Sequence, residues 1–537
     1  MLDIKKLTNK IPLMLAALFS AASVATVIYY ILYPSAAFFH SDCADTILWA
    51  QASYDAKALF NPDFGYAAML PFGGAMLMAP FIGIFGVSMT THHIGMVIFA
   101  LLMFAAVWFL FRSLKFSHSA SLAAVGFTAM ILCSGTKLRE MFFEHSIYYS
   151  ISVVIICVLL SLLLRLKESY DNDSIKKFVF LAACIIVFSA CSALDGMQVI
   201  SMSIVPVIFA AAAEVILNKE DKIFSDRNKF PLYFCFICGG SAIIGLWILL
   251  LCSKDVSAGY ANAYTSYSNM DQWLENLGKF PAHWFSLFGV DAEYGKSIFS
   301  LHSIINLIRI ASAAIIAVVP LIALFFYKKF DFGSKILILT HFGTSAVIMF
   351  GYIFGLLSAA GWRLSPMVCT GLFVCLAAFR TAKNYILPMR FSVIALCVLF
   401  LMSGISFVSI AKMEKNGIAE NPKYQLAVLL EERGLKNGFA SFWNAHAITV
   451  LSDSEITVRN IDIKEEEGII KAKYQTNKSW YENDGETEEY FVLLTSEEVD
   501  TFQKSDEWEF FEAMAKDRFE IAEGYHIFTF DSTFFLD

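Results

Sequence analysis

Two carboxylates in an early polar segment have the type and spacing needed for acid–base chemistry. Asp42 and Asp45 lie in the sequence HSDCADTILWAQ, about ten residues after the first long apolar run. A spacing of three places both side chains on one face of a helical turn. A carboxylate held at a membrane surface and partly withdrawn from water can take a proton from a hydroxyl group. The alternative is that the two acids only mark a solvated loop.

A second short segment, SGTKLREMFFEHSIYYS, is crowded with titratable side chains between two apolar runs. It contains Lys137, Arg139, Glu140, Glu144 and His145. Charges at a membrane edge are costly unless they pair or have a function. Arg139 or Lys137 suits a phosphate group, which a guanidinium group binds through two parallel hydrogen bonds. Glu140 or Glu144 is a candidate second acid. The alternative is a salt-bridged loop that anchors two helix ends.

Isolated basic residues near other predicted helix ends have two interpretations each. Arg363 in GWRLSP is a candidate phosphate ligand, or a side chain that extends to the membrane surface beside Trp362. Arg309, inside a predicted span, either extends to the surface or pairs with a loop acid. His92 and His93 open the second span without an H-x-x-x-H spacing or a nearby Cys, so they are weak candidates for metal ligands.

The elements that position these residues are predicted to be membrane helices. Hydrophobic residues make up 57% of the 537 residues and charged residues 16%, with a mean hydropathy of +0.60. Soluble domains average about 25% charged residues. Apolar runs near the length of a bilayer span recur along the chain. We predict about eleven spans, near 11–33, 92–111, 119–135, 147–164, 177–194, 196–216, 232–252, 301–326, 335–357, 365–380 and 391–411.

The distribution of basic residues sets the orientation of these spans. The apolar stretch 68–87 carries two prolines and four glycines, so we predict a kinked or interfacial helix there rather than a span. With the N-terminus inside, the inner loops then hold 19 basic residues and the outer loops before the tail hold 7. The positive-inside rule favours this arrangement. It places the long loops 34–91 and 253–300 outside.

The C-terminal segment 412–537 has a different composition from the rest. It carries a net charge of −14, whereas residues 1–411 carry +6. An amphipathic run, NPKYQLAVLLEERG, is followed by β-like runs at GFASFW, AITVLS, EITVRNI, EYFVLLT and YHIFTFD. We predict a soluble, extracytoplasmic α+β domain. Its acidity argues against nucleic acid as a partner. Trp443, Asn444 and His446 either contact a glycan or pack a structural domain.

The motif Asp45-Thr-Ile-Leu-Trp-Ala-Gln, after one span and before a Pro/Gly-rich apolar helix, resembles the GT-C superfamily of membrane glycosyltransferases. The resemblance covers the architecture of residues 1 to about 411. It implies that an acid of the first outer loop activates an acceptor hydroxyl for attack on a sugar held by a polyprenyl phosphate, usually with inversion. Family members commonly have a second acid where Thr46 follows Asp45, so Asp42 stays an alternative base and Asp45 is favoured.

Further expectations follow from this resemblance. Asp45, Asp42 and Glu144 are the expected catalytic acids. The expected substrate-binding residues are Lys137, Arg139, Glu140, His145 and Arg363. The donor would be a polyprenyl-phosphate sugar and the acceptor a cell-envelope glycan or polymer, in the membrane of a bacterium. Some members use a divalent metal and others none, and no metal ligand is assigned.

Two other classes of membrane protein fit parts of the pattern. A polysaccharide polymerase or ligase is a related enzyme with another acceptor. A transporter or flippase of lipid-linked saccharides would show repeated halves and charged, broken helices at mid-membrane. The sequence has no internal repeat and few charges within its spans. A non-catalytic scaffold would tolerate neutralisation of the outer acids. Without a Walker or GxGxxG motif, a lipid-linked donor is favoured over a nucleotide sugar.

Overall fold

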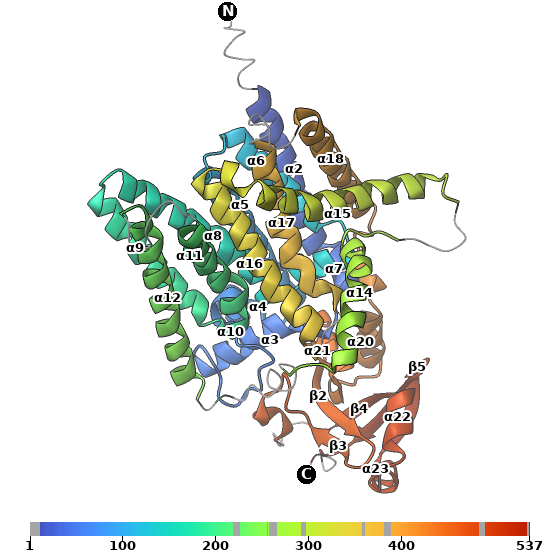
Figure 1. The fold of residues 1–537 in the computed structure, drawn as a ribbon. Helices are drawn as coiled ribbons and strands as arrows, with labels where there is room; N and C mark the ends of the chain where they lie inside the picture. Colours follow the sequence, from blue (N-terminus) through green and yellow to red (C-terminus); the bar gives the residue numbers. More distant parts are fainter. Residues whose placement is uncertain are drawn as a thin grey trace, which may run out of the picture. The chain divides into compact units, whose positions relative to one another are not determined.

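The structure is a computed structural model (Figure 1). It describes residues 11–217, 226–254, 256, 266–291, 297–356, 360–380, 388–482, 489–533 and 536. Some of the basic residues counted in the inner loops, among them those of residues 1–10, and parts of the predicted loop 253–300 lie outside the described residues.

The chain folds into two compact units. The helical unit consists of Met1–Tyr29, Ile98–Leu251 and Tyr264–Lys412. The mixed unit consists of Tyr30–Val97, Cys252–Ala263 and Met413–Asp537. The segment after the first span, predicted to be an outer loop of the membrane domain, therefore belongs to the same compact unit as the C-terminal domain.

Ten helices among the described residues are long and apolar enough to cross a membrane, or eleven if a bent pair counts as one span. The ten are α2 (Ile11–Leu32), α5 (Met89–Ser113), α8 (Tyr148–Asp171), α9 (Ile175–Ala193), the run α10–η4–α11 (Gly196–Leu217), α12 (Asp226–Cys252), α15 (Leu301–Phe325), α16 (Phe332–Phe354), the run η6–α17 (Gly361–Arg380) and α18 (Met389–Ala411). This agrees with the prediction of about eleven spans.

Large apolar side chains project outward from these helices. Phe236, Ile243 and Trp247 on α12 and Phe325 on α15 are exposed. A water-soluble protein rarely exposes so much contiguous apolar surface, whereas lipid chains solvate it. The chain is a multi-pass membrane protein. The stretch predicted to be a kinked helix forms the π-helical turn η2 (Pro71–Ala75) and the short apolar helix α4 (Met76–Phe85).

The bent pair contains the second candidate segment. The helix α6 (His118–Leu132) is followed, at an angle of 119°, by the stretch Thr136–Glu144, which comprises α7 (Thr136–Arg139) and the π-helical turn η3 (Glu140–Glu144). A Cβ atom at Gly135 would lie 2.1 Å from the backbone oxygen of Leu287. The chain can turn this closely only because that position has no side chain.

The predicted loop 253–300 contains a helix of its own, α14 (Met270–Leu287). The indole nitrogen of Trp284 donates a 3.0 Å hydrogen bond to the backbone oxygen of Ala313 on α15. The side-chain amide of Asn276 donates one of 3.0 Å to the oxygen of Ile353 on α16. These contacts hold α14 against two spanning helices of the same unit.

A six-stranded sheet with the order β3-β2-β1-β4-β6-β5 forms the centre of the C-terminal domain. Figure 1 labels β2, β3, β4 and β5 of this sheet. The central strand β1 pairs in parallel with β2 and β4, and the remaining pairs are antiparallel. The strands are β1 (Asn437–Ser441), β2 (Thr457–Lys464), β3 (Gly468–Lys471), β4 (Tyr490–Thr495), β5 (Asp517–Ala522) and β6 (Tyr525–Phe530).

Helices cover both faces of this sheet. Val492 and Leu494 pack with α22 (Ser496–Phe502) and α23 (Trp508–Met514). Phe491 and Leu493 face the other way, toward α20 (Pro422–Glu432) and α21 (Phe442–Leu451). Both faces of β4 are therefore buried, which explains its continuous apolar sequence. The prediction of a sheet-containing α+β domain is confirmed.

One predicted strand is wrong. The β-like run AITVLS, residues 447–452, forms the second half of α21 and the residue after it. Ile448, Val450 and Leu451 are buried, so the run is apolar because it packs in the core. A short apolar run does not distinguish a buried helix from a buried strand.

Candidate functional site

The helix α3 (Ser41–Ala56) carries the first candidate acids. It follows the short 3₁₀ helix η1 (Pro34–Phe38) and ends at Lys57, which adopts a left-handed conformation with φ 51°. Most of its first three turns are buried, and it packs against η2, α4 and α21 of the same unit. The side chains of Asp42 and Asp45 therefore lie one turn apart on a helix enclosed by its neighbours.

Asp45 is the more deeply buried of the two acids. Its side chain is 7% exposed, whereas Asp42 is half-buried. Among the described residues, the Oδ1 atom of Asp45 has no hydrogen-bond partner of standard geometry. Burial raises the pKa of Asp45 well above its usual value, and the negative charge of Asp42 raises it further. A buried carboxyl group with a raised pKa is suited to accepting a proton near neutral pH.

A residue of the C-terminal domain that sequence reasoning did not identify lies beside Asp45. Gln475 is fully buried, and its side chain lowers the pKa of Asp45 by hydrogen bonding. Its Oε1 atom accepts a 2.8 Å hydrogen bond from the indole of Trp49 on α3. No local pattern marks Gln475, because a single Gln in a polar loop is ordinary.

The titratable residues of the second candidate segment lie in the helical unit. Lys137 forms a 2.5 Å ion pair with Glu140, and its ammonium group lies 5.5 Å from the ring centroid of Trp362. Arg139 is buried and donates hydrogen bonds to the backbone oxygen of Cys133, at 3.1 Å, and to the hydroxyl group of Thr136, at 3.3 Å. Both predicted basic residues, Lys137 and Arg139, therefore lie on α7.

The acids and the histidine of this segment are also buried. Glu140 and Glu144 form the ends of η3, and His145 follows it; all three side chains have little exposure. π-Helical turns occur frequently at functional sites. Burial of several ionisable groups in one short turn is expensive unless they interact with one another or with a ligand.

Two further arginines lie in the helical unit. Arg309 on α15 donates a 2.6 Å hydrogen bond to the backbone oxygen of Gly289 and is close enough to Arg139 for their charges to interact. Arg363 donates a 3.0 Å hydrogen bond to the oxygen of Gly351 on α16. Two guanidinium groups that repel each other would both be stabilised by an anion such as a phosphate group.

The predicted site residues therefore form two groups. Asp42 and Asp45 belong to the mixed unit, together with Gln475. The helical unit contains Lys137, Arg139, Glu140, Glu144, His145 and Arg363.

Two of the three C-terminal residues considered as glycan contacts are part of the core. Asn444 and His446 are buried, and only Trp443 is exposed. Asn444 accepts a hydrogen bond from the ammonium group of Lys423. Burial lowers the pKa of His446 to about 3. Both residues pack in the core of the domain around α21, which favours the alternative that they stabilise a structural domain.

The described part of the chain contains no group of three or more His, Cys, Asp and Glu side chains arranged to hold a metal ion. His92 is buried and His93 is half-buried, and both lie on α5, whereas Glu144 lies on η3. A divalent cation requires several converging oxygen or nitrogen ligands.

Comparison of the fold with solved structures finds two crystal structures of an oligosaccharyltransferase. The crystal structure of the Archaeoglobus fulgidus oligosaccharyltransferase in complex with zinc and sulfate has a TM-score of 0.49 and 12% identity, over 98% of this chain and 74% of that one. The apo form has a TM-score of 0.46 and 13% identity, over 83% and 64%. Both scores are below 0.5, so the similarity assigns neither a fold family nor an activity. No protein-family model and no curated protein matches the sequence.

Proposed function

We propose that the chain is a GT-C-type glycosyltransferase that moves a sugar from a polyprenyl-phosphate donor to an acceptor of the bacterial cell envelope. Asp45 would be the general base, with Asp42 as a supporting acid. The observation that carries the proposal is the burial of Asp45 on α3, directly after the first span, with an oxygen that no described residue hydrogen-bonds in standard geometry. The resemblance of the DTILWAQ motif to GT-C enzymes supports the same role.

The proposed step uses the carboxylate form of Asp45. The carboxylate takes the proton of an acceptor hydroxyl group as the hydroxyl oxygen forms a bond to the anomeric carbon. The bond from that carbon to the phosphate oxygen breaks, and its electron pair leaves with the carrier phosphate. Attack from the face opposite the leaving group inverts the anomeric configuration. A base of raised pKa takes a hydroxyl proton more readily than an ordinary carboxylate.

The basic residues of the helical unit are proposed to bind the carrier phosphate. Arg139 and Arg363 are the candidates from the sequence, with Lys137 beside them, and Arg309 joins them because its charge lies near that of Arg139. Glu140, Glu144 and His145 are proposed to contact the sugar. No step is assigned to a metal ion.

A transfer assay tests the proposed base. The purified protein is reconstituted in vesicles with a radiolabelled polyprenyl-phosphate hexose and an envelope-polymer fraction, and label in the polymer is measured. Asp45→Asn should lower the rate by about 10²- to 10⁴-fold, the usual contribution of a general base. Asp55→Asn, an exposed acid on the same helix, is the matched control and should keep the wild-type rate. Wild-type transfer by Asp45→Asn and Asp42→Asn would refute the mechanism.

The same vesicles distinguish the enzyme from a transporter. If labelled lipid crosses the bilayer and none enters the polymer, the chain is a flippase. If label accumulates in products of increasing length, the reaction is that of a polymerase. A scaffold would give neither result, and the acidic residues of α3 would then be replaceable together.

A further inference from the structure

The loop that follows β3 joins the C-terminal sheet to the segment that follows α3. The backbone N–H of Gly65 donates to the oxygen of Thr476 at 2.8 Å, and that of Gln475 donates to the oxygen of Gly65 at 2.7 Å. The N–H of Lys478 donates to the oxygen of Asp63 at 2.9 Å. The two segments thus form a short antiparallel bridge, although more than 400 residues separate them along the chain.

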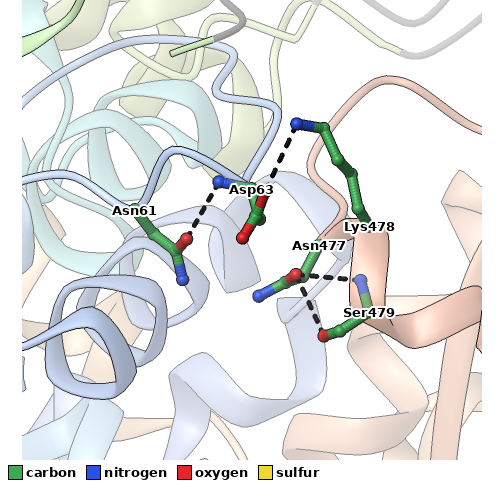
Figure 2. Close-up of polar contacts among 5 residues, drawn as sticks. All are labelled: Asn61, Asp63, Asn477, Lys478 and Ser479. Atoms are coloured by element: carbon green, nitrogen blue, oxygen red, sulfur yellow. Dashed lines mark hydrogen bonds and ion pairs between the residues drawn. The ribbon is translucent and has the colours of Figure 1, made fainter. Parts of the chain in front are cut away.

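Side chains reinforce this bridge, as Figure 2 shows. The ammonium group of Lys478 lies 3.3 Å from a carboxylate oxygen of Asp63. The Oδ1 atom of Asn61 accepts the backbone N–H of Asp63 at 3.0 Å. On the opposite segment, Oδ1 of Asn477 accepts the N–H and the hydroxyl group of Ser479. The ion pair is exposed and contributes little, so the backbone bonds fix the register.

The close approach of the two segments depends on a glycine. A Cβ atom at Gly65 would lie 2.3 Å from the backbone oxygen of Lys473. Any other residue at this position would push the two segments apart. The sequence between β3 and the 3₁₀ helix η8 (Lys478–Tyr481) is therefore placed against the first polar segment by main-chain contacts.

Gln475 lies at the centre of this contact in an unusual conformation. Its φ angle is 54°, in the left-handed region that residues with a Cβ atom seldom adopt. Its side chain is fully buried. Such strain persists where the surroundings over-determine the conformation, and it is concentrated at functional sites.

The hydrogen bonds of the Gln475 side chain fix which way its amide points. Oε1 accepts from the indole nitrogen of Trp49 at 2.8 Å and from the backbone N–H of Ala67 at 3.3 Å. Both partners can only donate, so the oxygen must face them and the NH₂ group must point elsewhere. Trp49 follows Asp45 by one helical turn, on the same face of α3.

The NH₂ group of Gln475 and the carboxyl group of Asp45 complement each other. Among the described residues, neither Nε2 of Gln475 nor Oδ1 of Asp45 has another hydrogen-bond partner of standard geometry. The amide is close enough to lower the pKa of Asp45, against the larger upward effect of burial. A buried donor and a buried acceptor without other partners are each costly, so an approach between them is favourable.

We infer that Gln475 is a positioning residue for Asp45: the C-terminal domain holds its amide NH₂ group against the carboxylate that the proposed function uses as a base. The amide orients the carboxylate and favours its ionised form. The inference rests on the proposed function for the role of Asp45, but its test does not require catalysis.

The titration of Asp45 also depends on the other titratable groups near it. Asp42 is the charged residue that acts on the carboxyl group. Of the elements packed on α3, η2 and α4 carry no titratable side chain, and α21 carries His446. His446 stays neutral above about pH 3 because burial lowers its pKa. A change in the titration of Asp45 on replacement of Gln475 is therefore not explained by a change in the charge of His446.

The experiment measures the protonation of Asp45 in the full-length protein. Dicyclohexylcarbodiimide reacts with protonated carboxyl groups, and mass spectrometry gives the labelled fraction of Asp45 at each pH. The infrared C=O band that Asp45→Asn removes gives the same midpoint independently. Gln475→Met removes the amide, so the midpoint should rise by about one pH unit, the effect of losing one hydrogen bond to a charged group. Gln475→Glu keeps an acceptor for Trp49 and should raise it further through like charge.

The control is Lys478→Met, which removes the exposed ion pair with Asp63 and should leave the midpoint unchanged. If Gln475→Met does not fold, the Gln475→Glu variant decides. An unchanged midpoint in the folded Gln475 variants would overturn the inference, and so would an equal shift in Lys478→Met. A shifted midpoint together with full sugar transfer by Asp45→Asn would uphold the inference and refute the proposed base.

Discussion

The indole nitrogen of Trp49 donates a 2.8 Å hydrogen bond to the side-chain oxygen of Gln475, and the two residues are 426 positions apart in the sequence. This bond joins the first polar segment of a membrane protein to its C-terminal domain. It also determines the orientation of the Gln475 amide beside Asp45. The C-terminal domain is thus built into the surroundings of the candidate base.

Trp49→Phe should destabilise the mixed unit. The change keeps an aromatic ring but removes the donor, which leaves the buried Gln475 oxygen with the 3.3 Å hydrogen bond from the backbone N–H of Ala67. We expect a loss of about 1–2 kcal/mol in the free energy of unfolding, measured by denaturation in detergent. Trp443→Phe, at an exposed position, should have little effect. Equal losses in the two variants would contradict the assigned bond.

The stability of the protein should depend on pH through Asp45. Because its pKa is raised in the folded state, the folded protein binds this proton more tightly than the unfolded chain. Stability is therefore lost as the pH rises from the unfolded pKa, about 4, through the folded pKa. This loss of stability amounts to about 1.4 kcal/mol for each unit by which the folded pKa exceeds the unfolded pKa. The Asp45→Asn variant should not show it. The difference between the melting temperatures of the two proteins should change steadily with pH across this range. A difference that stays constant would contradict the prediction.

Gly135→Ala should weaken the junction between α6 and α7. The new methyl group would lie 2.1 Å from the oxygen of Leu287 and 3.0 Å from the nitrogen of Gly289. Overpacking against backbone costs about 1–3 kcal/mol. Gly240→Ala is the matched control, since a Cβ atom there meets no atom within 4 Å. Thermal unfolding in detergent compares the two, and an unaffected Gly135→Ala would show that the junction can relax.

Arg139→Lys should weaken binding of the carrier phosphate. A lysine keeps the charge but loses the planar fork that binds phosphate through two hydrogen bonds. We expect the dissociation constant for polyprenyl phosphate to rise about tenfold, which corresponds to one charge-assisted hydrogen bond. Polyprenol without phosphate should bind both proteins equally. Arg433→Lys in the C-terminal domain serves as the control, and a similar loss there would argue against a phosphate role for Arg139.

The C-terminal domain should be accessible from outside the cell. The segment 412–537 contains no Cys, so a single Cys can be placed at the exposed position Lys504 in a chain whose 11 native cysteines are replaced. A membrane-impermeant maleimide should label Lys504→Cys in intact cells. Labelling only after the cells are broken would place the domain inside and reverse the predicted orientation.

The sequence predicted the elements that depend on a run of neighbouring residues or on the overall composition of a segment. Spanning helices were evident because each must be apolar over the thickness of the bilayer, and no tertiary contact can substitute for that. The acidic C-terminal domain was evident from its change in charge. The run at 447–452 was mispredicted because its apolar residues serve the core of either a helix or a strand, and only the packing of α21 on the sheet selects the helix.

At the candidate site, the sequence by itself determined that two acids, Asp42 and Asp45, follow the first span at helical spacing. Only the tertiary structure decided that Asp45 is the more buried, that Asp42 raises its pKa and that Gln475 lies against it. The reason is physical: desolvation and hydrogen bonding depend on which distant backbone closes over a side chain. Here the main-chain hydrogen bonds between Gly65 and the loop after β3 bring Gln475 to Asp45. The residue types near Asp45 in the sequence do not predict these bonds.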